Sequence, residues 1–183
     1  RLLKEFTGLV VVDEAYIDFS EEESWAKEID NYPNLVVLQT MSKAFGLAGI
    51  RLGIALANPE VINYMMKVKA PYNVNKLTSD IALKAFDAEE NITSNIDSII
   101  QERIRVEKEL NSIPYIQKVY PSSGNFLLFK IEDALNIYKK LADSGVIIRY
   151  RGNEPHCENC LRLTIGKPSE NDEFLKQLTS ILA

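Results

Sequence analysis

The chain has 183 residues, of which 46% are hydrophobic, which is enough for one substantial core or two small ones. Its net charge is −5, so no basic field attracts nucleic acid, and no apolar run approaches the roughly 20 residues of a membrane span. Two cysteines and the lack of a signal peptide in this sequence favour a cytoplasmic protein.

The first half of the chain alternates apolar runs with helical patterns. Each apolar run resembles a buried strand, and the first one ends in a carboxylate, Asp13. Residues 1–6 resemble the last turns of an amphipathic helix, for which Gly8 is the expected C-terminal cap. Strands are predicted at residues 9–13, 35–40 and 51–57, and helices at residues 58–69 and 76–88.

The second half begins with the longest helical pattern, residues 91–113, where isoleucines recur on one side. Further strands are predicted at residues 116–120, 125–131, 146–149 and 161–165, with helices at 133–143 and from 169 onward. The fold class is therefore α/β. We expect residues 1–90 to be part of a larger α/β domain, and residues 91–183 to form a long connecting helix and a small α+β domain.

The most informative segment is residues 40–51, TMSKAFGLAGIR. It places Lys43 on a turn between two apolar runs, with hydroxyl groups shortly before it and Arg51 after it. A Schiff-base enzyme that uses pyridoxal 5'-phosphate needs an amine for the cofactor aldehyde. Such an enzyme also needs hydroxyl groups and a guanidinium for the cofactor phosphate. This segment therefore predicts an enzyme with a catalytic lysine.

Three segments, in the same order, resemble the histidinol-phosphate aminotransferase family of fold-type I, class II aminotransferases. They are residues 11–19 (VVDEAYIDF), residues 40–51 and residues 161–166 (LRLTIG), so the resemblance covers nearly the whole chain. It implies the C-terminal half of a fold-type I transferase that depends on pyridoxal 5'-phosphate. The implied reaction moves an amino group between L-histidinol phosphate and 2-oxoglutarate, in histidine biosynthesis.

The resemblance also implies roles for individual residues. Lys43 would attach the cofactor and move protons, and Asp13 would pair with the pyridine nitrogen to keep it protonated. Tyr16 would donate a hydrogen bond to the phenolic oxygen. The ligands of the cofactor phosphate would be Thr40, Ser42 and Arg51.

Two arginines in the second half match the substrate arginines of the family. Arg149 and Arg162 are predicted on the ends of two strands, and each guanidinium can bind an oxyanion with two hydrogen bonds. They would therefore serve both the phosphate of one substrate and the carboxylates of glutamate. Asn125 matches a family motif near the substrate. An arginine such as Arg149 can also be a solvated surface residue.

Other interpretations stay open from the residues alone. Residues 10–15 also resemble a Walker B strand of a nucleotide hydrolase, although no G-x-x-x-x-G-K-[ST] loop is present. A phosphothreonine-type decarboxylase resembles the same enzymes, and another class II aminotransferase is a further alternative. The sequence His156-Cys157-Glu158-Asn159-Cys160 offers too few ligands for a structural zinc site, so we expect no metal and interpret it as a loop.

The matching family has about twice this length and works as a homodimer. We therefore expect these residues to be the C-terminal half of an enzyme, and the isolated half to be inactive or nearly so. A non-catalytic module is the alternative from a different class of protein. The expected partners are small molecules and a second subunit, without nucleic acid or membrane.

Overall fold

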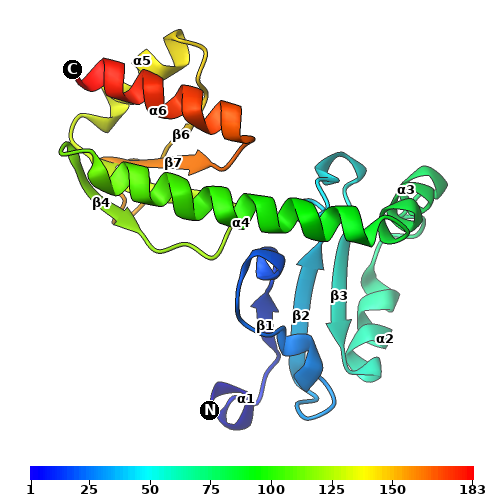
Figure 1. The fold of residues 1–183 in the computed structure, drawn as a ribbon. Helices are drawn as coiled ribbons and strands as arrows, with labels where there is room; N and C mark the ends of the chain where they lie inside the picture. The colour runs from blue at the N-terminus through cyan, green and yellow to red at the C-terminus, as the bar shows by residue number, and fades with distance from the viewer. The chain divides into compact units, whose positions relative to one another are not determined.

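The computed structural model describes residues 1–183 apart from the side chain of Glu89. The chain divides into two compact units, Arg1–Ser94 and Asn95–Ala183. Each unit contains one β-sheet and helices that cover it (Figure 1).

The first unit is organised around a three-stranded sheet in the order β1-β2-β3. Strand β1 (Val10–Asp13) pairs in parallel with β2 (Leu35–Thr40), and β2 pairs antiparallel with β3 (Gly53–Ala57). Parallel strands end at the same edge of a sheet, and an antiparallel neighbour begins there. The carboxyl ends of β1 and β2 therefore lie at the edge where β3 begins, with Thr40 opposite Gly53.

The middle strand is the core of this unit. Leu35, Val36 and Val37 are fully buried, as expected for a central strand that is covered on both faces. Helical segments complete the unit: α1 (Leu2–Glu5), η1 (Ile17–Phe19), η2 (Trp25–Glu28), η3 (Ala48–Ile50), α2 (Pro59–Val68) and α3 (Lys76–Phe86). The predicted helix start at Asn58 is confirmed, because its side chain accepts a hydrogen bond from the Glu60 N–H, with proline next to the cap.

Two local predictions in this unit are wrong. The third strand begins at Gly53 rather than at residue 51, because Arg51 has a left-handed backbone with φ of 55°. Gly8 does not cap the first helix: α1 ends at Glu5, and the N–H of its cap residue Phe6 already donates to the Leu2 carbonyl oxygen.

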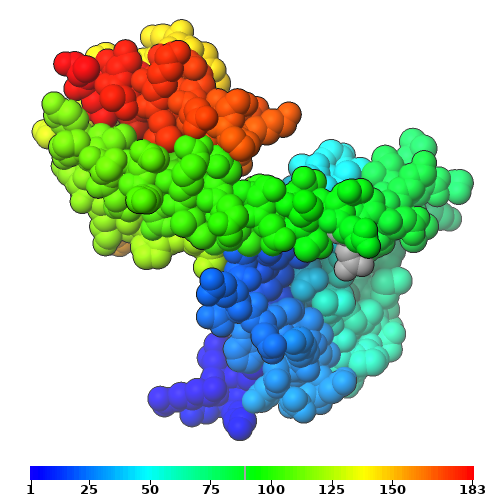
Figure 2. Space-filling model, viewed as in Figure 1, coloured from blue at the N-terminus to red at the C-terminus, as the bar shows by residue number. Residues whose placement is uncertain are grey.

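Helices α2 and α3 expose much apolar surface. Tyr72, in the connection between them, is 97% exposed, and Val68 at the end of α2 is 84% exposed. Further exposed apolar side chains on these helices are Tyr64, Met66, Leu77, Ile81, Leu83 and Phe86. This apolar region, residues 64–86, belongs to the teal part of the surface in Figure 2.

The second unit contains a four-stranded antiparallel sheet in the order β4-β5-β7-β6. Helix α4 (Glu89–Ser112) begins at the end of the first unit and continues into the second. The remaining elements are β4 (Ile116–Tyr120), β5 (Phe126–Ile131), α5 (Ala134–Asp143), β6 (Arg149–Tyr150), β7 (Cys160–Thr164) and α6 (Pro168–Leu182).

Residues alternate between the two faces of this sheet. On β5, Leu127, Phe129 and Ile131 are buried in the core, whereas the residues between them are only half-buried. Leu161 and Leu163 of β7 face the same core, which buried residues of α4, α5 and α6 complete. The opposite face of β7 therefore carries Cys160, Arg162 and Thr164.

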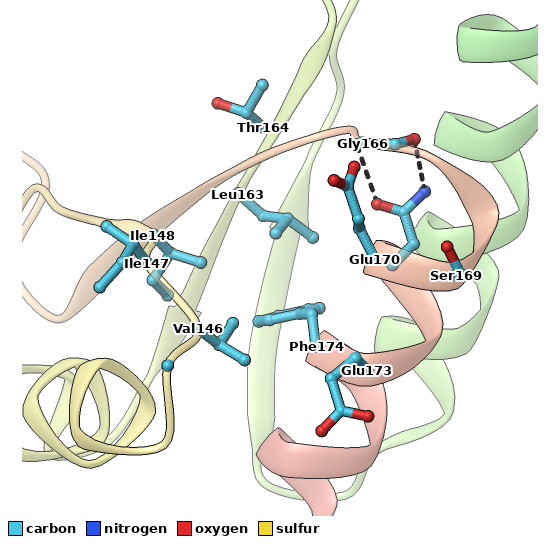
Figure 3. A pocket seen from close by; sticks show the side chains of 12 residues that line it. Val146, Ile147, Ile148, Leu163, Thr164, Gly166, Ser169, Glu170, Glu173 and Phe174 are labelled. Carbon is cyan, nitrogen blue, oxygen red and sulfur yellow. Dashed lines mark hydrogen bonds between the residues drawn. The ribbon is translucent and has the colours of Figure 1, made fainter.

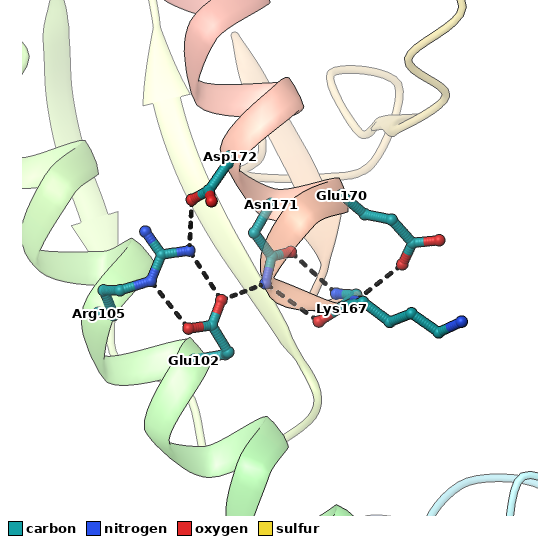
Figure 4. Close-up of polar contacts among 7 residues, drawn as sticks. Glu102, Arg105, Lys167, Glu170, Asn171 and Asp172 are labelled. Atoms are coloured by element: carbon teal, nitrogen blue, oxygen red, sulfur yellow. Dashed lines mark hydrogen bonds and ion pairs between the residues drawn. The ribbon is translucent and has the colours of Figure 1, made fainter.

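A polar cluster joins α4 to the first turn of α6 (Figure 4). Arg105 donates two hydrogen bonds of 2.8 Å to Glu102 and forms an ion pair with Asp172. Asn171 donates to Glu102 and to the Gly166 carbonyl oxygen, and it accepts a hydrogen bond from the Gly166 N–H. The hydrogen bonds from Arg105 lower the pKa of Glu102. The cluster therefore holds the turn that follows β7.

Strand β6 is shorter than predicted. Residues 146–149 were expected to be extended, but the observed strand is Arg149–Tyr150. The Val146 N–H donates to the Leu141 carbonyl oxygen at 2.8 Å, after Gly145 with φ of 86°. These residues therefore terminate α5 instead of pairing with β7.

Candidate active site

Three predicted site residues lie at the edge of the first sheet where β1 and β2 end. Asp13 is the last residue of β1, and its carboxylate accepts a 3.0 Å hydrogen bond from the Ala15 N–H. Thr40 is the last residue of β2. Arg51 precedes β3 by two residues, so the strand order brings it to the same edge. These groups are far apart in the sequence, and the pairing of β1 with β2 and of β2 with β3 brings them to one edge.

Lys43 and Tyr16 are in contact at this edge. The Lys43 Nζ atom lies 5.1 Å from the centre of the Tyr16 ring, a cation–π distance. Both side chains are half-buried. The loop after β1 therefore meets the loop after β2, and the amine lies near a phenol. This pair can hold an aromatic aldehyde cofactor, with the amine for its carbonyl group and the phenol as a hydrogen-bond donor.

The connection from β2 to β3 is ordered by its own backbone hydrogen bonds. The Leu47 N–H donates to the Met41 carbonyl oxygen at 2.9 Å, and the Gly46 N–H donates to that of Lys43 at 3.0 Å. Gly46 has φ of 66°, a value that favours glycine. The side chain of Thr78 on α3 donates to the Ile50 carbonyl oxygen at 3.2 Å, which fixes the residue before Arg51.

Thr40 has partners inside this connection. Its hydroxyl group donates to the Leu52 carbonyl oxygen at 3.2 Å and accepts from the Ser42 N–H at 3.1 Å. The Arg51 guanidinium is exposed and donates one hydrogen bond, to the Ala48 carbonyl oxygen. A guanidinium has five donors, so Arg51 can also bind an anion. The Thr40 hydroxyl has one proton, so donation to a phosphate requires exchange of its bond to the Leu52 carbonyl oxygen.

Glu14 is a buried residue of this edge that the sequence did not single out. It is 5% exposed and accepts hydrogen bonds from the Ser24 hydroxyl at 2.6 Å, the Trp25 N–H at 2.6 Å and the Gln39 amide at 3.0 Å. These donors come from two other segments of the chain. Glu14 therefore fixes the residue after Asp13 to the end of β2.

We expect Glu14→Ala to destabilise the chain by about 2–3 kcal/mol, because three donors would lose a buried charged acceptor. Urea unfolding followed by circular dichroism would measure the change. Glu21→Ala is the matched control, because Glu21 is an exposed glutamate in the adjacent segment. Equal unfolding midpoints for the two variants would contradict a structural role for Glu14.

The two predicted substrate arginines are direct neighbours across the second sheet. Arg149 of β6 is paired with Arg162 of β7, so their side chains lie on the same face. The Arg162 guanidinium lies 5.2 Å from the centre of the Phe126 ring. Its Nε atom is buried and has no hydrogen-bond partner among the described residues. Like charges placed directly opposite each other destabilise a sheet, so this pair is suited to an anionic ligand.

Asn125 lies immediately before β5, and its carbonyl oxygen accepts a 2.9 Å hydrogen bond from the Ile165 N–H just after β7. It therefore joins the ends of two central strands. A cavity of about 520 Å³ lies between β7 and the start of α6 (Figure 3). Its lining includes Val146, Leu163 and Phe174, but none of the predicted site residues.

The described residues contain no group of three or more His, Cys, Asp or Glu side chains that could hold a metal ion. Within the same residues, no helix is long and apolar enough to cross a membrane. His156 and Cys157 lie in a loop between β6 and β7, which agrees with the predicted loop, and Cys160 is the first residue of β7.

Solved structures with the same architecture define the class of protein. The chain matches the histidinol-phosphate aminotransferase of Clostridium acetobutylicum with a TM-score of 0.91 at 28% identity, over 98% of this chain and 57% of that one. It matches the L-threonine-O-3-phosphate decarboxylase of Porphyromonas gingivalis with a TM-score of 0.83 at 26% identity, over 94% and 54%. The fold is that of the C-terminal half of a fold-type I transferase, as predicted.

The family follows from the sequence comparison. Residues 1–178 match the family model of aminotransferase class I and II, and the chain belongs to that family. The histidinol-phosphate aminotransferase of Flavobacterium johnsoniae is 52% identical over 178 residues, which are 97% of this chain and 51% of that protein. The chain thus spans about half the length of the curated relatives it matches.

Proposed function

We propose that this chain is part of an aminotransferase that uses pyridoxal 5'-phosphate to exchange an amino group between L-histidinol phosphate and 2-oxoglutarate, in histidine biosynthesis. The observation that carries the proposal is the contact of Lys43 with Tyr16 at the strand edge that also contains Asp13. The 52% identical relative from Flavobacterium johnsoniae, a histidinol-phosphate aminotransferase, supports the choice of substrate.

The chemistry of the donor groups fits this cofactor. When bound, pyridoxal 5'-phosphate accepts electrons from the substrate α-carbon into its ring. In the proposal the Asp13 carboxylate would hold the pyridine nitrogen, and the Tyr16 hydroxyl would donate to the phenolic oxygen. Lys43 would supply the amine for the aldehyde carbon and would move the proton at the substrate α-carbon. The phosphate would bind Thr40, Ser42 and Arg51.

The substrate proposal concerns the second unit. Arg149 and Arg162 would bind the phosphate of histidinol phosphate and the carboxylates of glutamate, with Asn125 beside them. The buried and unpartnered Nε atom of Arg162 supports this, because an oxyanion would supply the acceptor that it lacks among the described residues. The placement of two arginines directly opposite each other on neighbouring strands suits a doubly charged phosphate.

The proposal extends to the assembly and the compartment. We propose that residues 1–90 belong to the large cofactor-binding domain and residues 91–183 to the long helix and the small domain. The complete enzyme would be a cytoplasmic homodimer. The exposed apolar region of α2 and α3, residues 64–86, supports a protein contact there.

Reductive labelling tests the cofactor proposal. The chain would be incubated with pyridoxal 5'-phosphate and reduced with borohydride, and the modified lysine would be mapped by mass spectrometry. We expect selective labelling of Lys43, because its amine lies beside a phenol rather than in open solvent. Labelling spread evenly over the lysines would count against a site in this half.

A decarboxylase is the second candidate, because the Porphyromonas gingivalis enzyme for L-threonine-O-3-phosphate has the same fold. Its substrate also contains an amine and a phosphate, so it would need the same cofactor residues and an anion site. The complete protein would be given L-threonine-O-3-phosphate without a keto acid. Release of carbon dioxide without an amino acceptor would favour the decarboxylase.

A further inference from the structure

The loop between β6 and β7 is a series of tight turns closed on itself. The N–H groups of Glu154, Cys157 and Cys160 each donate to the carbonyl oxygen three residues earlier, at 2.9, 3.1 and 2.9 Å. The Arg151 N–H donates to the Cys160 carbonyl oxygen at 2.9 Å, which pairs the first residue of the loop with the last. The conformation of residues 151–160 is therefore fixed by its own backbone.

The last turn places two cysteines at its ends. Cys157 and Cys160 are the first and fourth residues of a β-turn, which brings their Cα atoms within about 7 Å. Disulfides have Cα separations of about 4.4–6.8 Å. The turn therefore already brings the two Cα atoms close to the separation that a disulfide needs. Asn159, the third residue, has φ of 59°, a left-handed value that asparagine tolerates.

The two thiols differ in exposure. Cys157 is half-buried, whereas Cys160 is 1% exposed and faces away from the hydrophobic core on β7. Burial raises the pKa of the Cys160 thiol, and the charge of a Cys157 thiolate raises it further. The chain has two cysteines, so these two can pair only with each other within it.

We propose that Cys157 and Cys160 are an oxidisable dithiol that forms a reversible disulfide by exchange with a low-molecular-weight disulfide such as oxidised glutathione. The more accessible Cys157 thiolate attacks one sulfur of that disulfide, forms a mixed disulfide and releases one thiolate. Cys160 then loses its proton and attacks the Cys157 sulfur, which releases the second thiolate. Two protein thiols are oxidised, and one small disulfide is reduced to two thiols.

The disulfide would act on the strand that carries Arg162. Cys160 is the first residue of β7 and lies two residues before Arg162, on the same face of the sheet. The Cys160 thiol donates a hydrogen bond to the Glu158 carbonyl oxygen, with the sulfur 3.8 Å from it. Oxidation would turn the Cys160 sulfur towards Cys157. The first residue of β7 would then lose its present sulfur contact, whereas Arg162 would not be chemically altered.

Equilibration in glutathione buffers tests the proposal. The chain would be brought to equilibrium at a series of ratios of reduced to oxidised glutathione, quenched in acid, alkylated and analysed by mass spectrometry. Cleavage after Arg151 and Arg162 gives one peptide that contains both cysteines. We expect this peptide to be lighter by two hydrogen atoms, without bound glutathione.

The same titration in denaturant isolates the contribution of the fold. We expect the folded chain to stay oxidised at a ratio about tenfold more reducing, equivalent to about 30 mV for two electrons, because the turn holds the thiols together. Equal or easier reduction of the folded chain would overturn the proposal, as would mixed disulfides with glutathione in place of the internal bond.

Two variants of the turn provide matched controls. Asn159→Gly keeps the left-handed residue and should leave the midpoint ratio unchanged. Asn159→Val disfavours that backbone and should shift the midpoint towards the value in denaturant. Circular dichroism would check that both variants are folded. Identical midpoints for both folded variants would contradict a role for the turn.

Discussion

Replacement of Lys43 with alanine is expected to lower transamination by the complete protein at least about 10²–10⁴-fold, which is the usual contribution of a positioned acid–base group. The loss has two causes in the proposed reaction. The variant has no amine for the cofactor aldehyde, and it has no group to move the proton at the substrate α-carbon. Turnover of L-histidinol phosphate with 2-oxoglutarate would be measured, together with cofactor retention after borohydride reduction.

Lys67→Ala is the matched control for this experiment. The Lys67 Nζ atom lies 5.0 Å from the centre of the Tyr64 ring, a contact very similar to that of Lys43 with Tyr16, but on helix α2. Normal turnover by Lys67→Ala and its loss in Lys43→Ala would assign the effect to the strand edge. Retained turnover in Lys43→Ala would refute the assigned role.

Arg162→Ala is expected to raise the KM for the phosphorylated substrate by roughly 10- to 100-fold, because each hydrogen bond to a charged group contributes about 1.5–3 kcal/mol. The effect on kcat should be smaller, since the residue binds an anion in the proposal and does not move protons. Arg162→Lys should recover only part of the affinity. A lysine keeps the charge, but it cannot form the two parallel hydrogen bonds of a guanidinium.

The free energy of unfolding of the Arg162→Ala variant distinguishes a binding role of Arg162 from a structural one. Arg149 and Arg162 are opposed like charges, so removal of one should leave the free energy of unfolding unchanged or raise it. Arg151→Ala is the control, because its side chain pairs with Glu154 in the loop. If Arg162→Ala unfolded more easily and kept its KM, a structural role would replace the binding role.

Much of the fold could be predicted from local patterns. The buried strand Leu35–Thr40 and the helix cap at Asn58 depend on nearby residues, and both are confirmed. The start of β3 could not be predicted, because Arg51 and Leu52 are continuous in sequence with the strand and no turn residue separates them from it. Only the loop hydrogen bonds and the left-handed Arg51 exclude these two residues from the strand.

In the candidate site, too, some residues could be recognised from their neighbours in the sequence, whereas others depend on contacts with distant segments. Lys43 and Asp13 could be singled out because each follows or ends an apolar run. Glu14 could not, because its donors lie 10, 11 and 25 residues away in the sequence. A buried carboxylate beside a candidate cofactor ligand is recognisable only once these segments are folded together.

The register between the two arginines is a further example. The sequence predicts that Arg149 and Arg162 lie on neighbouring strand ends, but it does not give their alignment. Val146 bonds back to the end of α5, and the observed strand β6 contains only two residues, Arg149 and Tyr150. The length of the turn-rich loop then sets Arg149 directly opposite Arg162.

The exposed apolar region of α2 and α3 makes the isolated chain amphiphilic. Side chains such as Tyr72 and Val68 expose apolar surface on a molecule that carries a net negative charge. Such a chain would collect at air–water interfaces and adsorb to plastic. A low concentration of ammonium sulfate would precipitate this chain, because salts that are excluded from the protein surface strengthen the association of apolar surfaces.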